Sequence, residues 1–169
     1  MGFDLYGAKM RGLRVLESLD ESESPVGDSP EKGEYFRANV WSWRPLWDLT
    51  CHIGGDVLTD EDRTMGQFND GYFIDAFKAT ALADCFAHMI DEGEHRTVVD
   101  KHNASLDALP LEECSHCGGT GERDDEHVKG ECNGCHGEGK SKSVDTFYRM
   151  YEDHIEEFES FLRHSGGFR

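Results

Sequence analysis

The sequence predicts a mainly α-helical protein with a small β-hairpin module and a short N-terminal strand, all in a single compact domain. Apolar side chains recur every three or four residues in several stretches, as in amphipathic helices. The string C-x-x-C-x-G-x-G occurs at 114–121 and again at 132–139, and the residues between the copies are expected to form the hairpin. The length of 169 residues, 37% of them apolar, suits one domain.

The N-terminal part divides into a strand-forming segment and a loop. In the segment 1–16, Phe3 and Leu5 alternate with their neighbours, which predicts a short strand. Residues 17–33 contain two prolines and six acidic side chains, so we expect an acidic, mobile loop there.

Residues 34–110 are predicted to form a helical core. Thr59 and Asp62 have the spacing of a capping box, which predicts a helix start. Pro45 suits the first turn of another helix. The apolar residues at helical spacing after it are Leu46, Leu49 and Ile53.

The strongest helical pattern covers 72–92 and leads into a second, antiparallel helix at about 94–108. Asn69 or Asp70 is the expected N-terminal cap of the first helix, and Gly93 is its expected end. The predicted apolar stripe consists of Ile74, Phe77, Ala81, Cys85 and Met89, widened by Leu82, Phe86 and Ile90.

The C-terminal segment 143–169 is predicted to contain a helix at 144–164 that packs on this core. The residues 165–167, Ser-Gly-Gly, are expected to end it, and Phe168 is expected to fold back on its last turn. The predicted apolar face consists of Phe147, Tyr151, Ile155, Phe158 and Leu162.

The module at 111–142 contains four cysteines whose spacing predicts a metal site. A C-x-x-C pair lets two sulfurs of one turn reach the same ion, and zinc prefers four ligands in a tetrahedron. The predicted ligands of one zinc ion are Cys114, Cys117, Cys132 and Cys135. Glycines tolerate the positive φ angles with which each turn curls back, and they stand at Gly119, Gly121, Gly137 and Gly139.

Four thiolates close the coordination shell and make zinc a poor Lewis acid, so we expect a structural rather than a catalytic ion. Two alternatives concern the same cysteines. They could form two local disulfides or stay free thiols, and His116 or His136 could replace one of them as a ligand.

The strings CSHCGGTG and CNGCHGEG resemble the repeats of the cysteine-rich domain of DnaJ-type (Hsp40) co-chaperones. That domain has four repeats and two zinc ions, whereas this chain has two repeats. The chain also lacks the His-Pro-Asp tripeptide with which J domains stimulate Hsp70. The resemblance implies a zinc fold and does not imply co-chaperone activity.

A broader resemblance rests on several stretches together with the two C-x-x-C-x-G-x-G strings, 114–121 and 132–139, which are called the first and second knuckle below. The other stretches are MGFDLYG, GEYFRANVWSWRPLW (33–47), LTDEDR (58–63), NDGYFIDAFKATALADCF (69–86) and EEFESFLRHSGGF (156–168). Together these resemble a family of small, uncharacterised zinc-knuckle proteins from bacteria, phages and other viruses. Residues 8–31 look like an insertion, and the segment between the knuckles is shorter than the family pattern. The resemblance implies a shared zinc fold and no activity; joined to the acidic, lysine-poor composition, it suggests a virus or host from a hypersaline habitat.

The charge balance limits the possible partners. There are 35 acidic and 17 basic residues, which give a net charge of −18. A field of this sign repels nucleic acid and anionic membranes, so we expect neither as a direct partner. Adaptation to a hypersaline habitat, mimicry of DNA and ordinary acidic solubility are three explanations for the charge.

The stretch WSWRPLW is a candidate interaction surface. Its aromatic rings and its arginine could line a ligand pocket through cation–π contacts, or they could pack in the core. The residues concerned are Trp41, Trp43, Arg44 and Trp47. Two further cysteines, Cys51 and Cys85, lie among apolar residues and are expected to be buried, unreactive thiols.

These patterns predict a non-enzymatic, zinc-stabilised module that binds another protein and is encoded by a virus. The alternatives are a virion or assembly component of a halophile virus, an acidic DNA mimic, and an enzyme built around the Trp/Arg cluster. The N-terminus MGFDLYGAKMRG lacks the apolar region of a secretory signal, so the expected location is the (host) cytoplasm or the virion. The oligomeric state stays open.

Overall fold

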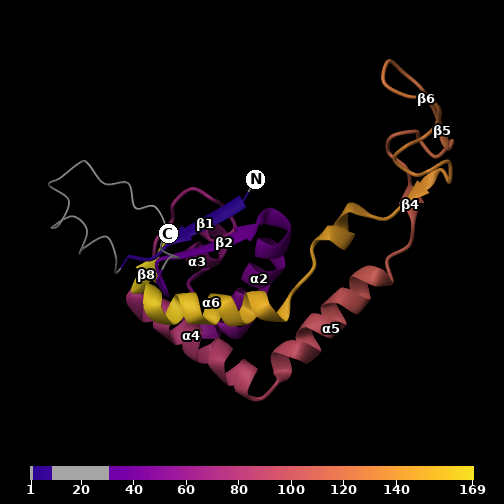
Figure 1. Ribbon diagram of the computed structural model, residues 1–169. Coiled ribbons are helices and arrows are strands. Elements are labelled where there is room, and N and C mark those ends of the chain that lie inside the picture. Colours follow the sequence, from indigo (N-terminus) through magenta and orange to yellow (C-terminus); the bar gives the residue numbers. More distant parts are fainter. Residues whose placement is uncertain (1, 9–30) are drawn as a thin grey trace, which may run out of the picture.

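The computed structural model describes residues 2–8 and 31–169, so the segment 9–16 and most of the predicted loop 17–33 lie outside the described residues. The predicted fold class is confirmed, because helices dominate and the strands form only two-stranded sheets (Figure 1). None of the described helices is long and apolar enough to cross a membrane. The α-helices of this part are α2 (Val40–Ile53), α3 (Asp60–Met65), α4 (Ala76–Asp91), α5 (Glu94–Asp107) and α6 (Glu152–Ser165).

The described strands pair antiparallel. The predicted N-terminal strand is present as β1 (Gly2–Tyr6), which pairs with β2 (Tyr35–Asn39) and buries Phe3 and Leu5. The other pairs are β3 (Ile74–Asp75) with β8 (Gly167–Phe168), β4 (Glu112–Glu113) with β7 (Lys140–Ser141), and β5 (Glu122–Asp124) with β6 (Lys129–Glu131). Two short 3₁₀-helices are η1 (Gly55–Val57) and η2 (Val144–Phe147).

Helix α2 begins at Val40, and the prediction that Pro45 stands in its first turn is wrong. The Asn39 side chain caps the helix by accepting hydrogen bonds from the backbone N–H groups of Trp41 (2.9 Å) and Ser42 (3.0 Å). Pro45 therefore lies inside the helix, where it cannot donate to the carbonyl of Trp41. The strong N-cap residue, and not the proline, marks the true start.

Two tryptophans of α2 join this helix to α3. The indole N–H groups of Trp43 and Trp47 donate to the carbonyls of Gly66 (2.9 Å) and Arg63 (3.0 Å) at the end of α3. Carbonyls at a helix end lack partners within the helix, so the indoles satisfy them. A Cβ at Gly66 would lie 2.0 Å from the Trp47 ring, so only glycine allows this close contact.

The core is centred on the Phe158 ring of α6, which is fully buried. Its neighbours come from four other elements, at centroid distances of 5.1 Å for Phe36, 5.7 Å for Trp43, 5.6 Å for Phe86 and 6.3 Å for Phe168. Phe168 folds back after α6, as predicted, and does so as part of β8. The last helix therefore ties β2, α2, α4 and β8 into one apolar cluster.

The buried face of α4 is rotated from the predicted stripe. The N-terminal cap is Asp75, which accepts from the backbone N–H of Lys78 (2.9 Å), so the prediction of Asn69 or Asp70 is wrong. Phe77, which the stripe included, is 82% exposed. The face is set by packing against α6 and β8, which periodicity alone does not identify. The buried residues of α4 are Ala79, Leu82, Ala83, Phe86 and Met89.

Helices α4 and α5 meet at a corner, and the predicted antiparallel pair is wrong (Figure 1). Gly93 stands at the corner with a φ of 73°, in the left-handed region that favours glycine. Helix α5 buries only His95 and Val99, so it has too little apolar surface to pack along α4. It extends away from the core and carries the cysteine module at its far end.

The chain returns from the module through an irregular segment rather than through the helix predicted at 144–164. After η2 the next helix, α6, begins only at Glu152. Phe147 and Tyr151, both assigned to the predicted apolar face, are 61% and 51% exposed. The prediction was correct for the later part of that face, where Ile155, Phe158 and Leu162 are buried.

Side chains of α5 fix the return segment, residues 143–151 between the module and α6, in place. Asn103 exchanges two hydrogen bonds with the backbone of Met150, at 3.0 and 3.1 Å. Asp107 pairs with the guanidinium of Arg149 at 2.8 Å. The incoming and outgoing connections of the module are thus tied to each other as well as to the core.

Candidate metal centre

The four predicted zinc ligands converge at one point. All four Sγ atoms lie within 4.8 Å of one another. Cys114 Sγ is 3.9 Å from Cys132 Sγ, and Cys117 Sγ is 3.7 Å from Cys135 Sγ. A tetrahedron with Zn–S bonds of about 2.3 Å has S···S edges of about 3.8 Å, so the spacing fits zinc. A disulfide would need about 2.05 Å, so these are free thiols that can bind a metal.

The backbone holds the two knuckles together in a reciprocal way. The N–H of Cys114 donates to the carbonyl of Gly139 (2.9 Å), and the N–H of Cys132 donates to the carbonyl of Gly121 (2.8 Å). The first cysteine of each knuckle is therefore bound to the last glycine of the other. Because the two copies have the same sequence frame, their backbones can make the same bond twice, and this explains the repeat.

The glycines of the repeat have the positive φ angles that the sequence predicts. Gly121 has a φ of 76° and Gly139 a φ of 69°. A Cβ at Gly121 would lie 2.3 Å from the carbonyl oxygen of Gly137, and a Cβ at Gly139 would lie 2.3 Å from that of Gly119. These two positions need glycine both for the backbone angle and for the close approach of the knuckles.

The electrostatics of the sulfurs favour a bound cation. The backbone N–H groups of Gly121 and Gly139 donate to Cys117 Sγ and Cys135 Sγ, both at 3.3 Å. Burial opposes ionisation of Cys117, but the Gly121 N–H and the other thiols outweigh it and bring its pKa to about 6. Burial and the neighbouring thiols raise the pKa of Cys135 to about 12. The thiolate of Cys117 is thus favoured and that of Cys135 opposed, and a divalent cation would stabilise both thiolates.

The histidines inside the knuckles do not belong to this cluster. His116 and His136 are exposed, and the four-thiol group includes neither. The His116 ring instead covers Gly134, where a Cβ would lie 2.4 Å from His116 Cδ2. The second knuckle has glycine at 134, and this leaves room for the His116 ring of the first knuckle.

Comparison with known proteins identifies no relative that has this site. No protein-family model, no curated protein and no solved structure matches the chain. The resemblances to the DnaJ cysteine-rich domain and to the small zinc-knuckle family therefore stay predictions.

The structure divides the Trp/Arg cluster into a buried and an exposed half. Trp43 and Trp47 are 1% and 0% exposed and belong to the core, so they cannot form an interaction surface. Trp41 and Arg44 point to the other side of α2 and are exposed. The physical reason is helical spacing, since residues four apart share one face and the residues between them do not.

The exposed half of this cluster borders a groove, as the pocket interpretation of WSWRPLW expected of Arg44, although the sequence did not identify the other residues that line it. The groove lies where α2, α5 and η2 meet, next to the connections of the module. It is lined by Arg44, Pro45, Asp48, His102, Asp145 and Tyr148. Residues from three separate stretches form it, and only their arrangement in space could have identified it.

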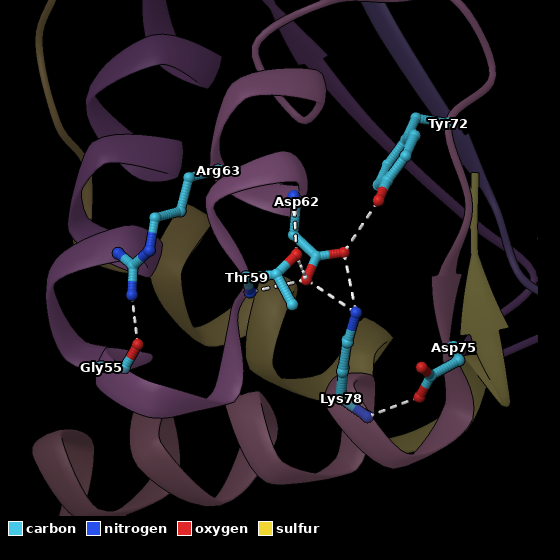
Figure 2. Close-up of polar contacts among 7 residues, drawn as sticks. All are labelled: Gly55, Thr59, Asp62, Arg63, Tyr72, Asp75 and Lys78. Carbon is cyan, nitrogen blue, oxygen red and sulfur yellow. Dashed lines mark hydrogen bonds and ion pairs between the residues drawn. The ribbon is translucent and has the colours of Figure 1, made fainter.

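A second polar cluster, around Asp62, is structural. Figure 2 shows the buried carboxylate of Asp62 accepting hydrogen bonds from Lys78 Nζ (2.7 and 2.9 Å), Tyr72 and Thr59. Burial alone would raise its pKa, but these bonds, led by that from Lys78, lower the pKa of Asp62 to about 2. The predicted capping box of Thr59 and Asp62 is confirmed. Both carboxylate oxygens are occupied, so the cluster joins α3 to α4 and leaves no acceptor for a ligand.

The remaining cysteines are poor nucleophiles. Cys51 and Cys85 are half-buried rather than fully buried as predicted. Burial raises the pKa of both thiols above the ordinary value. A reactive cysteine needs a lowered pKa, so neither thiol has the environment of a catalytic nucleophile.

Proposed function

We propose that the chain is a protein-binding module without catalytic activity of its own, in which one structural zinc ion closes the region between β4 and β7. The four-thiol cluster carries the proposal, because its spacing fits one tetrahedral ion. Four protein sulfurs fill all positions around zinc and leave none for water or a substrate. The ion then stabilises the fold and takes no part in a reaction.

The role in protein binding is supported by exposed apolar surface beside the module. Of the ten large apolar side chains that are exposed in the described residues, six lie on α2, at the end of α5 or in the return segment. Exposed apolar side chains that contact one another, as Trp41 and Phe147 do, are typical of interaction sites. The six are Trp41, Leu109, Leu111, Val144, Phe147 and Tyr151.

The distribution of charge favours a general effect on solvation over mimicry of DNA. Exposed carboxylates occur on each α-helix of the described part and throughout the module. A DNA mimic would concentrate its carboxylates along one face with the spacing of phosphates.

Two measurements test the proposal. Elemental analysis of the purified chain should give one zinc ion per chain, and a folded, zinc-free wild type would refute the zinc site. The zinc-loaded chain, tagged and incubated with lysate of its source cells, should retain one protein in stoichiometric amount. If it retains none, the proposed binding role is wrong.

A further inference from the structure

The groove at the base of the module combines three features that a bound peptide requires. One wall is the ring of Tyr148, and two rings outside the lining extend this aromatic wall: Trp41 contacts Tyr148 (4.9 Å between centroids) and Phe147 (5.5 Å). Trp41 and Phe147 are 37% and 61% exposed, so these contacts leave much of both rings open to solvent. This wall offers apolar area for a side chain of a partner.

The groove also contains a hydrogen-bond donor that the protein itself does not use. The guanidinium of Arg44 lies 6.0 Å from the centre of the Tyr148 ring. Within residues 2–8 and 31–169, the Arg44 side chain makes no hydrogen bond or ion pair. It can therefore donate to backbone carbonyls of an extended segment.

The two carboxylates in the groove outnumber its one guanidinium, that of Arg44, so the net charge of the groove is negative and matches a basic partner. Asp48 and Asp145 are exposed, and in residues 2–8 and 31–169 their side chains make no hydrogen bond or ion pair. The third polar group is already engaged, since His102 Nε2 lies 2.6 Å from the Tyr148 carbonyl. A carbonyl only accepts, so His102 donates there and fixes one side of the groove.

We propose that this groove binds an extended basic segment of a partner protein, with an arginine or lysine placed on Asp48 and Asp145 and a neighbouring apolar side chain placed on Trp41 and Phe147. The proposal rests on the protein-binding function proposed above and assigns it a place and a chemistry. A net charge of −18 draws a basic segment toward the chain and opposes the approach of a second copy, of nucleic acid and of an anionic membrane.

The position of the groove makes it dependent on the metal. Its aromatic wall combines Trp41 of α2 with Phe147 and Tyr148, which follow the module directly in the chain. The bonds from α5 fix this return segment, and zinc, by holding the two ends of the module together, would restrict it further. We therefore expect metal removal to weaken peptide binding even though no groove residue is a ligand.

The test uses the full, zinc-loaded, ¹⁵N-labelled chain and a capped hexapeptide of alternating arginine and tryptophan. Titration should shift backbone amide signals of 41–48 and 144–149 more than those of the rest of the chain. The double substitution Asp48→Asn/Asp145→Asn should weaken binding about tenfold, as expected for the loss of two exposed charge pairs. Trp41→Ala should weaken it further.

Matched variants separate a site from a general effect of charge. Asp56→Asn/Asp91→Asn removes two other exposed carboxylates and should change the affinity less than twofold. Phe77→Ala removes an exposed aromatic ring of α4 and should have no effect. Zinc content and circular dichroism should be unchanged in every variant.

Three results would overturn the proposal. These are equal losses of affinity in the two aspartate pairs, amide shifts spread over the whole surface, and equal binding of a capped peptide of alternating glutamate and tryptophan. A dimer in sedimentation that Phe147→Ala dissociates would assign the groove to a second copy instead. If the captured partner still binds the Asp48→Asn/Asp145→Asn chain, the assignment of binding to this groove is wrong and the protein-binding function stands. If the wild-type chain binds neither the peptide nor a partner, the protein-binding function is wrong as well.

Discussion

The helical core and the cysteine module of this protein are stabilised in opposite ways. The core buries more than twenty apolar side chains, many of them aromatic rings around Phe158. Between β4 and β7 the buried residues are only cysteines and glycines: Cys114, Gly121, Cys132, Cys135 and Gly139. Burial of apolar area stabilises the core, whereas the module has almost none to bury.

This difference means that one chain contains two separable folding problems. A module of this size without buried apolar side chains other than cysteine cannot offset the loss of chain entropy, so a metal bound by the four cysteines is the expected source of its stability. The core needs no metal, since its aromatic cluster is remote from the sulfurs.

The largest expected effect comes from removing a zinc ligand. Cys132→Ser should lower the zinc content from one ion per chain to a small fraction and unfold the module, because structural zinc contributes on the order of 10 kcal/mol to such folds. The far-ultraviolet signal and melting of the helical core should stay close to wild type. Cys51→Ser is the matched control, since Cys51 lies outside the cluster, and it should retain zinc.

Truncation of the Phe158 ring at the centre of the core should destabilise the core and leave zinc binding unchanged. Phe158→Ala should lower the free energy of unfolding by about 3–5 kcal/mol, the usual cost of removing a buried aromatic side chain. Zinc should stay bound, because the module does not contact this ring. Urea denaturation measures the loss, and Phe77→Ala should cost almost nothing because that ring is 82% exposed. Zinc loss from Phe158→Ala at concentrations of urea where the core is still folded would mean that the regions are coupled.

The module contains glycines that need only a positive φ angle and glycines that also lie close to another backbone segment, and substitutions can distinguish the two kinds. Gly121→Ala combines a φ of 76° with a Cβ placed 2.3 Å from the Gly137 oxygen, so it should weaken zinc binding by more than tenfold. Gly118→Ala has a φ of 58° and no atom near the new Cβ, so it should cost about 1 kcal/mol or less. Competition with a chromogenic chelator measures both, and equal effects would show that the close approach of the knuckles is unimportant.

Acid should destabilise the core by less than Phe158→Ala does, through protonation of Asp62. Its pKa is about 2 in the folded chain and about 3.9 in an unfolded one, so its ionised form favours the folded state. This contribution of about 2 kcal/mol is complete above pH 5 and is lost as the pH falls toward 2. Asp62→Asn should remove most of the slope of unfolding free energy against pH in that range. An unchanged slope would show that other carboxylates cause the acid sensitivity.

The sequence predicted the four-cysteine cluster and its glycines because both depend on local spacing. C-x-x-C fixes two sulfurs in one turn, and the repeat fixes the second pair, so no knowledge of distant contacts was needed. The strand at Phe3 and Leu5 and the capping box at Thr59 were predictable for the same reason.

The predictions from the sequence were wrong where tertiary contacts override the local pattern. The face of α4 follows β8 and α6, which left Phe77 outside the core, and Gly93 turned an expected helical hairpin into a corner. The groove beside Arg44 joins three distant stretches and has no signature in any one of them. Trp43 and Trp41 are two residues apart, yet one is buried and one is exposed.

Amide hydrogen exchange of the wild-type chain, measured with and without a zinc chelator, tests the separation of the two regions most directly. On chelation, amides between β4 and β7 should lose their protection, while those of α4 and α6 should keep theirs to within a factor of a few. Loss of protection in all of these segments together would contradict the account, and so would a module that stays protected after its zinc has been removed.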